Sequence, residues 1–147
     1  MLWSEAERAY IEYARVGRLA TADEDGRPHA VPICFAILDE TIVTPIDEKP
    51  KNCDTRELRR LQNIRADPRV TLIVDHYTEE WADLGWVQIR GTATVLDPDA
   101  DGHGKAVTAL RGKYDQYETH ALEDRPIIRI DPGQVVSWGR LSRPEQQ

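Results

Sequence analysis

Basic side chains gather in one stretch of an otherwise acidic chain, and their types suit the binding of an anion. Residues 49–69 hold seven Lys or Arg against three acids, a net charge of +4, whereas the whole chain carries −7. Lys and Arg bind phosphate groups through charge-assisted hydrogen bonds, most readily near the start of a helix. This basic segment therefore predicts a phosphate or polyanion site, with a solvated helix face as the alternative. Its cations are Lys49, Lys51, Arg56, Arg59, Arg60, Arg65 and Arg69.

The other reactive residue types form no catalytic or metal-binding pattern. The three serines lie outside the G-x-S-x-G order of a hydrolase nucleophile, and the four histidines have no close ligand spacing. Cys34 stands between apolar neighbours and is expected to be a small buried side chain, whereas Cys53 is expected to be an incidental thiol. The sequence thus argues against nucleophilic hydrolysis and against a zinc site.

Three tryptophans form a second group of interest. Trp81, Trp86 and Trp138 are expected at strand edges or in loops. Buried packing is the ordinary role of a tryptophan, but the same side chains also form platforms for a planar ligand.

Length, composition and charge narrow the class of protein. A chain of 147 residues fits one domain with one core. Its charge of −7 excludes a uniformly basic nucleic-acid binder, and its longest uncharged apolar run, 30–38, is far short of the ~20 residues that span a bilayer. The acidic start shows no secretory signal, and two cysteines fit a reducing compartment. We expect a cytoplasmic protein with one domain over 1–139 and a flexible tail over 140–147.

Apolar residues three and four apart predict three helices. The first covers 2–13, with Ser4 as its N-cap and Gly17 as its C-terminal stop. The second follows a capping box over 54–57, buries the apolar side chains between 58 and 64, and stops at Asp67-Pro68. The third covers 105–114.

Alternating patterns and turn signals predict six or seven strands. Asp23 to Gly26 has the composition of a tight hairpin turn. Strands in short hairpins, interrupted by helices, favour a mainly β fold with helices (α+β), an antiparallel barrel or sandwich. The strands are expected over 18–22, 28–38, 41–46, 69–76, 86–96, 126–130 and 134–138. Strand 28–38 is apolar on both faces, so one face is expected to meet a second subunit across a two-fold axis.

Three motifs resemble the flavin-binding split β-barrel family, the superfamily of pyridoxamine 5′-phosphate oxidase. The resemblance covers about residues 16–97, with a weaker echo over 126–139, and is strongest to short actinobacterial-type members thought to use the deazaflavin coenzyme F-420. The motifs are Leu19-Ala20-Thr21 with Gly26-Arg-Pro28-His-Ala-Val-Pro32-Ile, Ala66-Asp67-Pro68-Arg69-Val70, and Trp86-Val-Gln-Ile-Arg-Gly91-Thr-Ala.

The resemblance implies an antiparallel split barrel whose cofactor lies in a groove between two chains. The strand 30–33 would line the cofactor ring through its backbone, two residues of the next strand would flank it, and the basic segment would hold its phosphate-bearing tail. One tryptophan would lie near the ring and another would cover it. These residues are Ala30, Val31, Pro32, Ile33, Thr44, Pro45, Lys49, Lys51, Arg56, Arg59, Arg60, Trp86 and Trp138.

The resemblance also implies the chemistry. The expected function is a cytoplasmic, homodimeric oxidoreductase that uses F-420, or FMN as the alternative, to reduce an organic small molecule by hydride transfer. Five cations suit the long anionic tail of F-420 better than the single phosphate of FMN. Val31 stands where true pyridoxamine phosphate oxidases carry an arginine, and the chain is expected to be too short for their C-terminal substrate-binding segment, so that activity is not expected. The proton would come from water, His29 or Tyr77. A non-catalytic carrier of flavin, deazaflavin or haem is the competing hypothesis.

Overall fold

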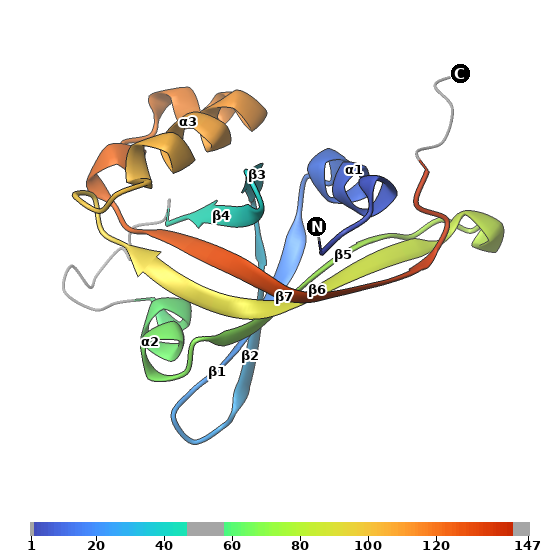
Figure 1. The fold of residues 1–147 in the computed structure, drawn as a ribbon, viewed down its shortest axis with the longest axis horizontal. Coiled ribbons are helices and arrows are strands. Elements are labelled where there is room, and N and C mark those ends of the chain that lie inside the picture. Colours follow the sequence, from blue (N-terminus) through green and yellow to red (C-terminus); the bar gives the residue numbers. More distant parts are fainter. Residues whose placement is uncertain (1, 47–57, 143–147) are drawn as a thin grey trace.

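A computed structural model describes residues 2–46 and 58–142. The described residues form one seven-stranded antiparallel sheet with three α-helices, so the expected α+β class is confirmed (Figure 1). None of these helices is both long enough and apolar enough to cross a membrane. The elements are α1 (Glu5–Tyr13), β1 (Gly17–Ala22), β2 (Pro28–Ile33), β3 (Ala36–Leu38), β4 (Thr41–Pro45), α2 (Arg59–Ala66), β5 (Arg69–His76), β6 (Gly85–Leu96), α3 (His103–Lys113) and β7 (Ile127–Gly139).

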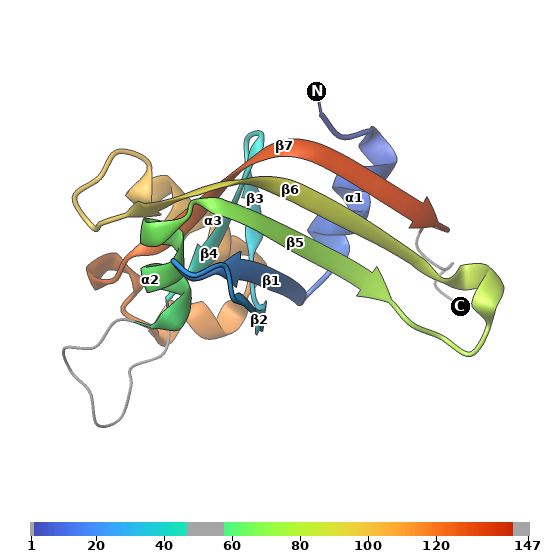
Figure 2. The same cartoon turned by 90° about the horizontal axis from the view of Figure 1, so that it is seen from below.

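The order of the strands explains why the sheet curls into a split barrel. The order is β2-β1-β5-β6-β7-β4-β3, so two strands that follow each other in the chain, β2 and β3, form opposite edges. Only Cys34 and Phe35 join them, and three Cα steps span at most about 11 Å. The two edges must therefore lie close together, which requires the strong curl of the sheet that Figures 1 and 2 show.

The break between β2 and β3 corrects the prediction of one strand over 28–38. The hydroxyl of Thr44 donates to the carbonyl oxygen of Cys34 (2.7 Å), and the backbone N–H of Phe35 donates to the hydroxyl of Tyr114 (3.1 Å). Side chains thus take the place of ladder partners at these two residues. The chain can leave one edge and join the other without burying an unpaired backbone group.

The last strand also differs from the prediction of two strands over 126–130 and 134–138. β7 is continuous and pairs with β6 along its whole length, with a register shift between Arg90 and Gly91. Pro132 lies at this irregularity, where a missing N–H costs no regular ladder bond. A Cβ on Gly91 would overlap the carbonyl oxygen of Asp131, so the strands approach this closely only at a glycine.

The predicted helix starts and stops are confirmed in part. Ser4 is the N-cap of α1 in a capping box with Glu7, as expected. Gly17 does not end this helix, because α1 ends at Tyr13; Gly17 begins β1, where a Cβ would lie 2.9 Å from a methyl carbon of Leu72. Asp67 ends α2 as predicted, while the capping box over 54–57 lies outside the described residues.

Two buried clusters hold the helices against the sheet. The larger cluster fills the inside of the curled sheet and includes Phe35, Leu72 and Ile89; Leu61 and Ile64 of α2 join it. A smaller cluster packs α3 against β3 and β4. Inside the larger cluster, the side-chain amide of Asn63 donates to the hydroxyl of Thr21 (2.9 Å), which fixes α2 on β1. The helix that carries Arg59 and Arg60 therefore has a defined position against β1 and β6.

Candidate functional site

A cavity of about 300 Å³ lies where β2, β4 and the start of α2 meet. Five of the residues predicted to hold a cofactor line it, and they come from three elements that the sequence separates. Their convergence follows from the curl of the sheet, which brings the end of β2 to the same cavity as β4, where Thr44 bonds to Cys34. The lining residues are Val16, Pro32, Ile33, Cys34, Thr44, Pro45, Arg60 and Tyr117.

Arg60 is the cation of this cavity within the described residues. Its Nε atom is buried and has no hydrogen-bond partner there. A buried donor that lacks a partner costs free energy, and a guanidinium pairs well with phosphate or carboxylate oxygens. An anionic group, or another strong hydrogen-bond acceptor, bound in the cavity would therefore give this donor a partner. The phosphate of a flavin-type cofactor is such a group.

Arg59 lies next to Arg60 in the chain but faces a different neighbour. It is exposed and does not line the cavity. The backbone N–H of Arg27 holds the pKa of Asp23 below its usual value, and the positive charge of Arg59 adds to this effect. Arg59 therefore lies near the β1–β2 turn, so the two arginines predicted to act together are directed to different places.

The remaining predicted residues lie apart from the cavity. Ala30 is exposed and Val31 is half-buried against the core, both on β2. Trp86 and Trp138 are directly opposite each other in the β6–β7 ladder, and Trp138 is 54% exposed. Lys49, Lys51 and Arg56 lie outside the described residues, as does Cys53.

Neither expected proton donor lines the cavity. Tyr77 is exposed, and its hydroxyl donates to Glu79 (2.9 Å). His29 is half-buried on β2, and its Nδ1 atom is buried without a partner among the described residues. The predicted roles of these residues stay predictions.

Three lining residues were not predicted, and they carry no motif. Val16 lies in the short link between α1 and β1, and Tyr117 lies in the 3-10 turn Asp115–Thr119 that follows α3. Cys34 lies at the break between β2 and β3. Each of these residues lies where a regular element ends or begins, so no periodic pattern shows which way its side chain points. Only the tertiary fold brings them together.

A buried amine lies over the rings of Phe35 and Tyr114. The Nζ atom of Lys113 is 4.1 Å from the centre of the Phe35 ring and has no hydrogen-bond partner among the described residues. Burial, together with the nearby charge of Arg15, lowers the pKa of Lys113 to about 8. Burial also raises the pKa of Tyr114 to about 12. The phenol stays protonated, so it can hold the backbone of Phe35 in place.

A curled seven-stranded antiparallel sheet whose two edge strands follow each other in the chain, with a cavity beside the edge strand β2, is the architecture of a split barrel. The model of the family described as pyridoxamine 5′-phosphate oxidase matches residues 4–139. The chain belongs to this family.

Relatives within this class have different described functions. The chain is 29% identical over 140 residues, 95% of its own length and 84% of the relative's, to 5a,11a-dehydrotetracycline/5a,11a-dehydrooxytetracycline reductase from Streptomyces rimosus. It is 29% identical to a FAD-binding protein from Mesorhizobium loti, with a TM-score of 0.64 and coverage of 92% and 94% of the two chains.

Two further solved structures share the fold at lower identity. One is an F-420 reductase, 24% identical with a TM-score of 0.66 and coverage of 91% and 98%. The other is the haem storage protein HutZ from Vibrio cholerae, 16% identical with a TM-score of 0.70 and coverage of 95% of each chain. The fold is thus shared by a reductase and by a haem protein.

Proposed function

We propose that this protein is an oxidoreductase that binds the deazaflavin F-420 in the cavity and reduces an organic small molecule by hydride transfer. The observation that carries the proposal is the buried, unpartnered Nε atom of Arg60 in a cavity lined by apolar side chains. The relative named as a reductase and the F-420 reductase of the same fold support this choice. FMN is the alternative cofactor.

The residues of the cavity suit the two parts of such a cofactor. Arg60 would hold a phosphate group through charge-assisted hydrogen bonds. β2 is an edge strand that pairs only with β1, so it has backbone groups without a ladder partner that can bind the polar edge of a ring. Pro32, Pro45 and Val16 would contact the apolar surface of the ring. The lysines and arginine of 49–56 would add charge for a longer anionic tail.

The chemistry comes from the cofactor, and the protein supplies binding and orientation. When bound in its reduced form, a deazaflavin supplies a hydride. Thr44 cannot also donate its hydroxyl hydrogen to the cofactor, because that hydrogen is already donated to the carbonyl oxygen of Cys34. Its role in the cavity is to fix the break between β2 and β3, which shapes the wall against which a ring would pack.

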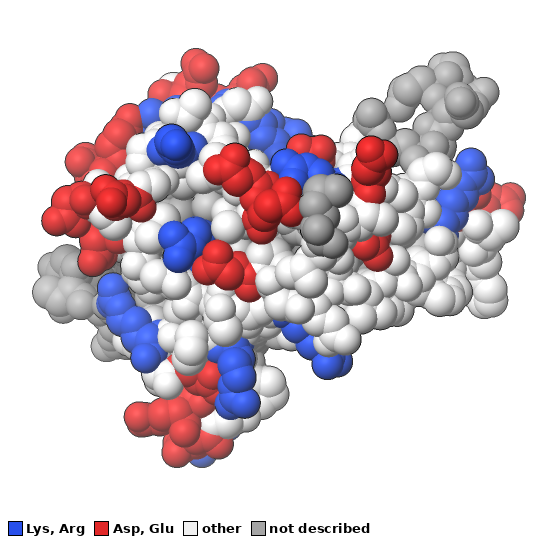
Figure 3. Space-filling model, in the orientation of Figure 1, with Lys and Arg blue, Asp and Glu red and all other residues white. Residues whose placement is uncertain are grey.

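The size of the cavity supports the proposal of a homodimer. About 300 Å³ is at the lower end of the range for ligand sites, about 300–1,000 Å³, so a three-ring cofactor with a tail needs further covering surface. Such a surface exists on β6 and β7, where Trp86, Val136 and Trp138 are at least partly exposed. Figure 3 shows few charged side chains over these strands, whereas charges crowd around α3 and the β1–β2 turn.

A second copy of the chain would supply that surface through a two-fold interface. Sedimentation equilibrium of the purified protein should give twice the chain mass of 16.8 kDa at micromolar concentration. Trp138→Asp should shift the equilibrium toward monomer, and Thr108→Asp on the exposed face of α3 is the matched control. A monomeric wild-type protein would contradict the shared site.

A non-catalytic carrier of flavin, deazaflavin or haem is the second candidate. Its support is the haem storage protein of the same fold and the presence of Cys34 and Tyr117 in the cavity, since thiolate and phenolate oxygen both bind haem iron. A carrier would bind its ligand tightly and show no turnover.

One set of titrations tests the proposal against this alternative. The protein is titrated in the same buffer with F-420, FMN and haem, and binding is followed by absorbance and fluorescence. We expect F-420 to bind most tightly, and reduced F-420 bound to the protein to be oxidised by members of a panel of organic acceptors. Tight binding of haem with no binding of F-420 or FMN would refute the oxidoreductase proposal.

A further inference from the structure

Tyr114, the residue that follows α3, joins three segments that are far apart in the chain. Its hydroxyl accepts from the backbone N–H of Phe35 (3.1 Å), and the carbonyl oxygens of Phe35 (3.0 Å) and Arg15 (2.9 Å) both lie within reach of its one hydrogen. Its ring meets the ring of Tyr117 edge-on, with 5.5 Å between the ring centres. The three segments are the link between α1 and β1, the break between β2 and β3, and the 3-10 turn after α3.

Each of these segments carries one residue of the cavity wall. Val16, Cys34 and Tyr117 line the cavity, and the first two are immediate neighbours of the residues that the Tyr114 hydroxyl contacts. The side chain of Tyr114 is 5% exposed and does not line the cavity itself. Its hydroxyl can therefore act on a bound ligand only through these neighbours.

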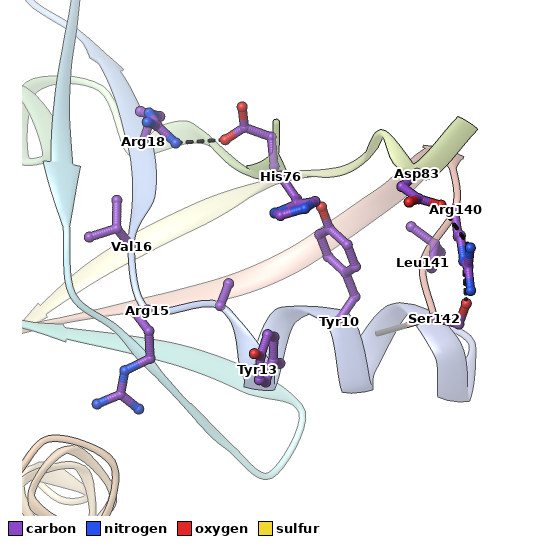
Figure 4. Close-up of a pocket in the computed structure, with 12 residues that line it drawn as sticks. Tyr10, Tyr13, Arg15, Val16, Arg18, His76, Asp83, Arg140, Leu141 and Ser142 are labelled. Carbon is purple, nitrogen blue, oxygen red and sulfur yellow. Dashed lines mark hydrogen bonds and ion pairs between the residues drawn. The ribbon is translucent and has the colours of Figure 1, made fainter. Parts of the chain in front are cut away.

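Arg15 ties the link between α1 and β1 to the end of α3 a second time. Its guanidinium lies over the ring of Tyr114, 4.6 Å from the ring centre, and donates to the carbonyl oxygen of Lys113 (2.9 Å). Figure 4 shows this side chain directed away from Tyr10. Burial raises the pKa of Tyr114 to about 12, so the hydroxyl keeps the hydrogen that it donates at neutral pH. The end of α3 thus holds the link through both its backbone and its side chain.

Loss of the Tyr114 hydroxyl would leave a buried donor without its partner. Phe35 is 0% exposed and lies between the end of β2 and the start of β3, so its N–H takes no part in a ladder. A buried N–H that loses its acceptor is costly, and the break would move until this group reached water or another acceptor. The cavity wall at Cys34 would move with it, because Cys34 is the preceding residue.

We propose that Tyr114 is a positioning residue for ligand binding: its hydroxyl holds Val16, Cys34 and Tyr117 in the arrangement that the ligand of the cavity requires. That this ligand is F-420 or FMN rests on the proposed function, whereas the effect of the hydroxyl on the cavity wall does not. The inference therefore has one test without a ligand and one with a ligand.

Tyr114→Phe removes the hydroxyl and keeps the ring, and Tyr10→Phe is the matched control. The hydroxyl of Tyr10 donates to the carbonyl oxygen of Gly85 (2.8 Å), and burial raises the pKa of this phenol as well. Tyr10 does not line the cavity. Both variants lose a phenolic hydroxyl with a backbone partner, and urea unfolding measures how much stability each variant loses.

The first test is amide hydrogen exchange by NMR without ligand. We expect Tyr114→Phe to speed exchange at Phe35 and Tyr117 at least tenfold, and Tyr10→Phe to leave both rates within twofold of the wild type. The N–H of Tyr117 bonds to the backbone carbonyl of Tyr114 (3.1 Å), so faster exchange there reports movement of the wall and not the lost hydroxyl bond itself. Unchanged rates in Tyr114→Phe, or equal rates in the two variants, would overturn the inference.

A second variant keeps this test available if Tyr114→Phe does not fold. Arg15 is exposed, so Arg15→Ala leaves the core intact while it removes the contact with the Tyr114 ring and the bond to Lys113. Exchange at Tyr117 should rise at least threefold in this variant. An unchanged rate would overturn the inference in that case.

The second test is a fluorescence titration with F-420 and with FMN. Tyr114→Phe should raise the dissociation constant of the ligand that binds the wild type at least fivefold, and Tyr10→Phe should change it less than twofold. A merely structural role would lower the stability of both variants and leave the affinity of the folded protein unchanged, so an unchanged dissociation constant in Tyr114→Phe would overturn the positioning role. Binding of neither ligand to the wild type would refute the proposed function, and the exchange rates alone would then decide whether Tyr114 positions the wall.

Discussion

Replacing Arg60 by Ala should weaken cofactor binding, and replacing Arg59 by Ala should not. Arg60 lines the cavity with a buried Nε atom that has no partner among the described residues, whereas Arg59 is exposed and lies near Asp23. A hydrogen bond to a charged group contributes roughly 1.5–3 kcal/mol. Since about 1.4 kcal/mol is a factor of ten, Arg60→Ala should raise the dissociation constant of F-420 by about 10- to 150-fold.

The assay is a fluorescence titration of F-420 into the wild type and the two single variants. The free energy of unfolding in urea serves as the control for folding. Arg60→Ala should not destabilise the protein through a lost hydrogen bond, because its Nε atom makes none within the described residues. Equal effects of the two substitutions on affinity would refute the assignment of Arg60 to the cofactor, and would return both residues to a solvated helix face.

Three further predictions concern the basic segment, the buried amine and the N-terminal helix. Affinity for F-420 should fall markedly from 0.1 M to 1 M salt, because the Debye length shortens from ~10 Å to ~3 Å, and the fall should be larger for longer glutamate tails. The affinity for FMN should depend less on salt. Equal salt dependence of the two affinities in parallel titrations would contradict the choice of F-420. The folded-state pKa of Lys113, about 8, lies below its ordinary value of 10.5. The protonated amine therefore opposes folding at neutral pH. The free energy of unfolding should rise as the pH rises from about 8 to 10.5, because the amine loses its proton in the folded state first. Lys113→Met should raise the free energy of unfolding at pH 7 and abolish that rise in urea titrations at several pH values; an unchanged pH profile would refute the burial argument. Ser4→Ala removes the capping box with Glu7 and should lower the free energy of unfolding by ~1 kcal/mol, and no loss in urea unfolding would show that α1 does not depend on its cap.

The sequence predicted those element boundaries that depend on neighbouring residues in the chain. Asp67-Pro68 ends α2, and the strand predicted over 69–76 has the observed bounds, because a proline prevents a helix from continuing. The break between β2 and β3 has no local signal. It depends on Thr44, ten residues away from Cys34, and on Tyr114, 79 residues away from Phe35. Only the tertiary fold brings these hydroxyls to the backbone.

Some residues of the candidate site were predicted from the sequence and others were not. The sequence indicated Pro32, Thr44 and Arg60 correctly as neighbours in space, but it treated Arg59 and Arg60 as equivalent. Adjacent residues on a helix point about 100° apart, and only the position of α2 against β1 decides which one reaches the cavity. Val16 was missed because a link between two elements has no periodicity that shows what it faces.

The most direct test of the central claim is a crystal structure of the protein with F-420 bound. We expect the phosphate group within hydrogen-bond distance of Arg60 and the deazaflavin ring against Pro32 and Ile33. We also expect the β6–β7 surface of a second copy to cover the ring. A cofactor bound elsewhere, with the cavity between β2, β4 and α2 left without it, would contradict the account.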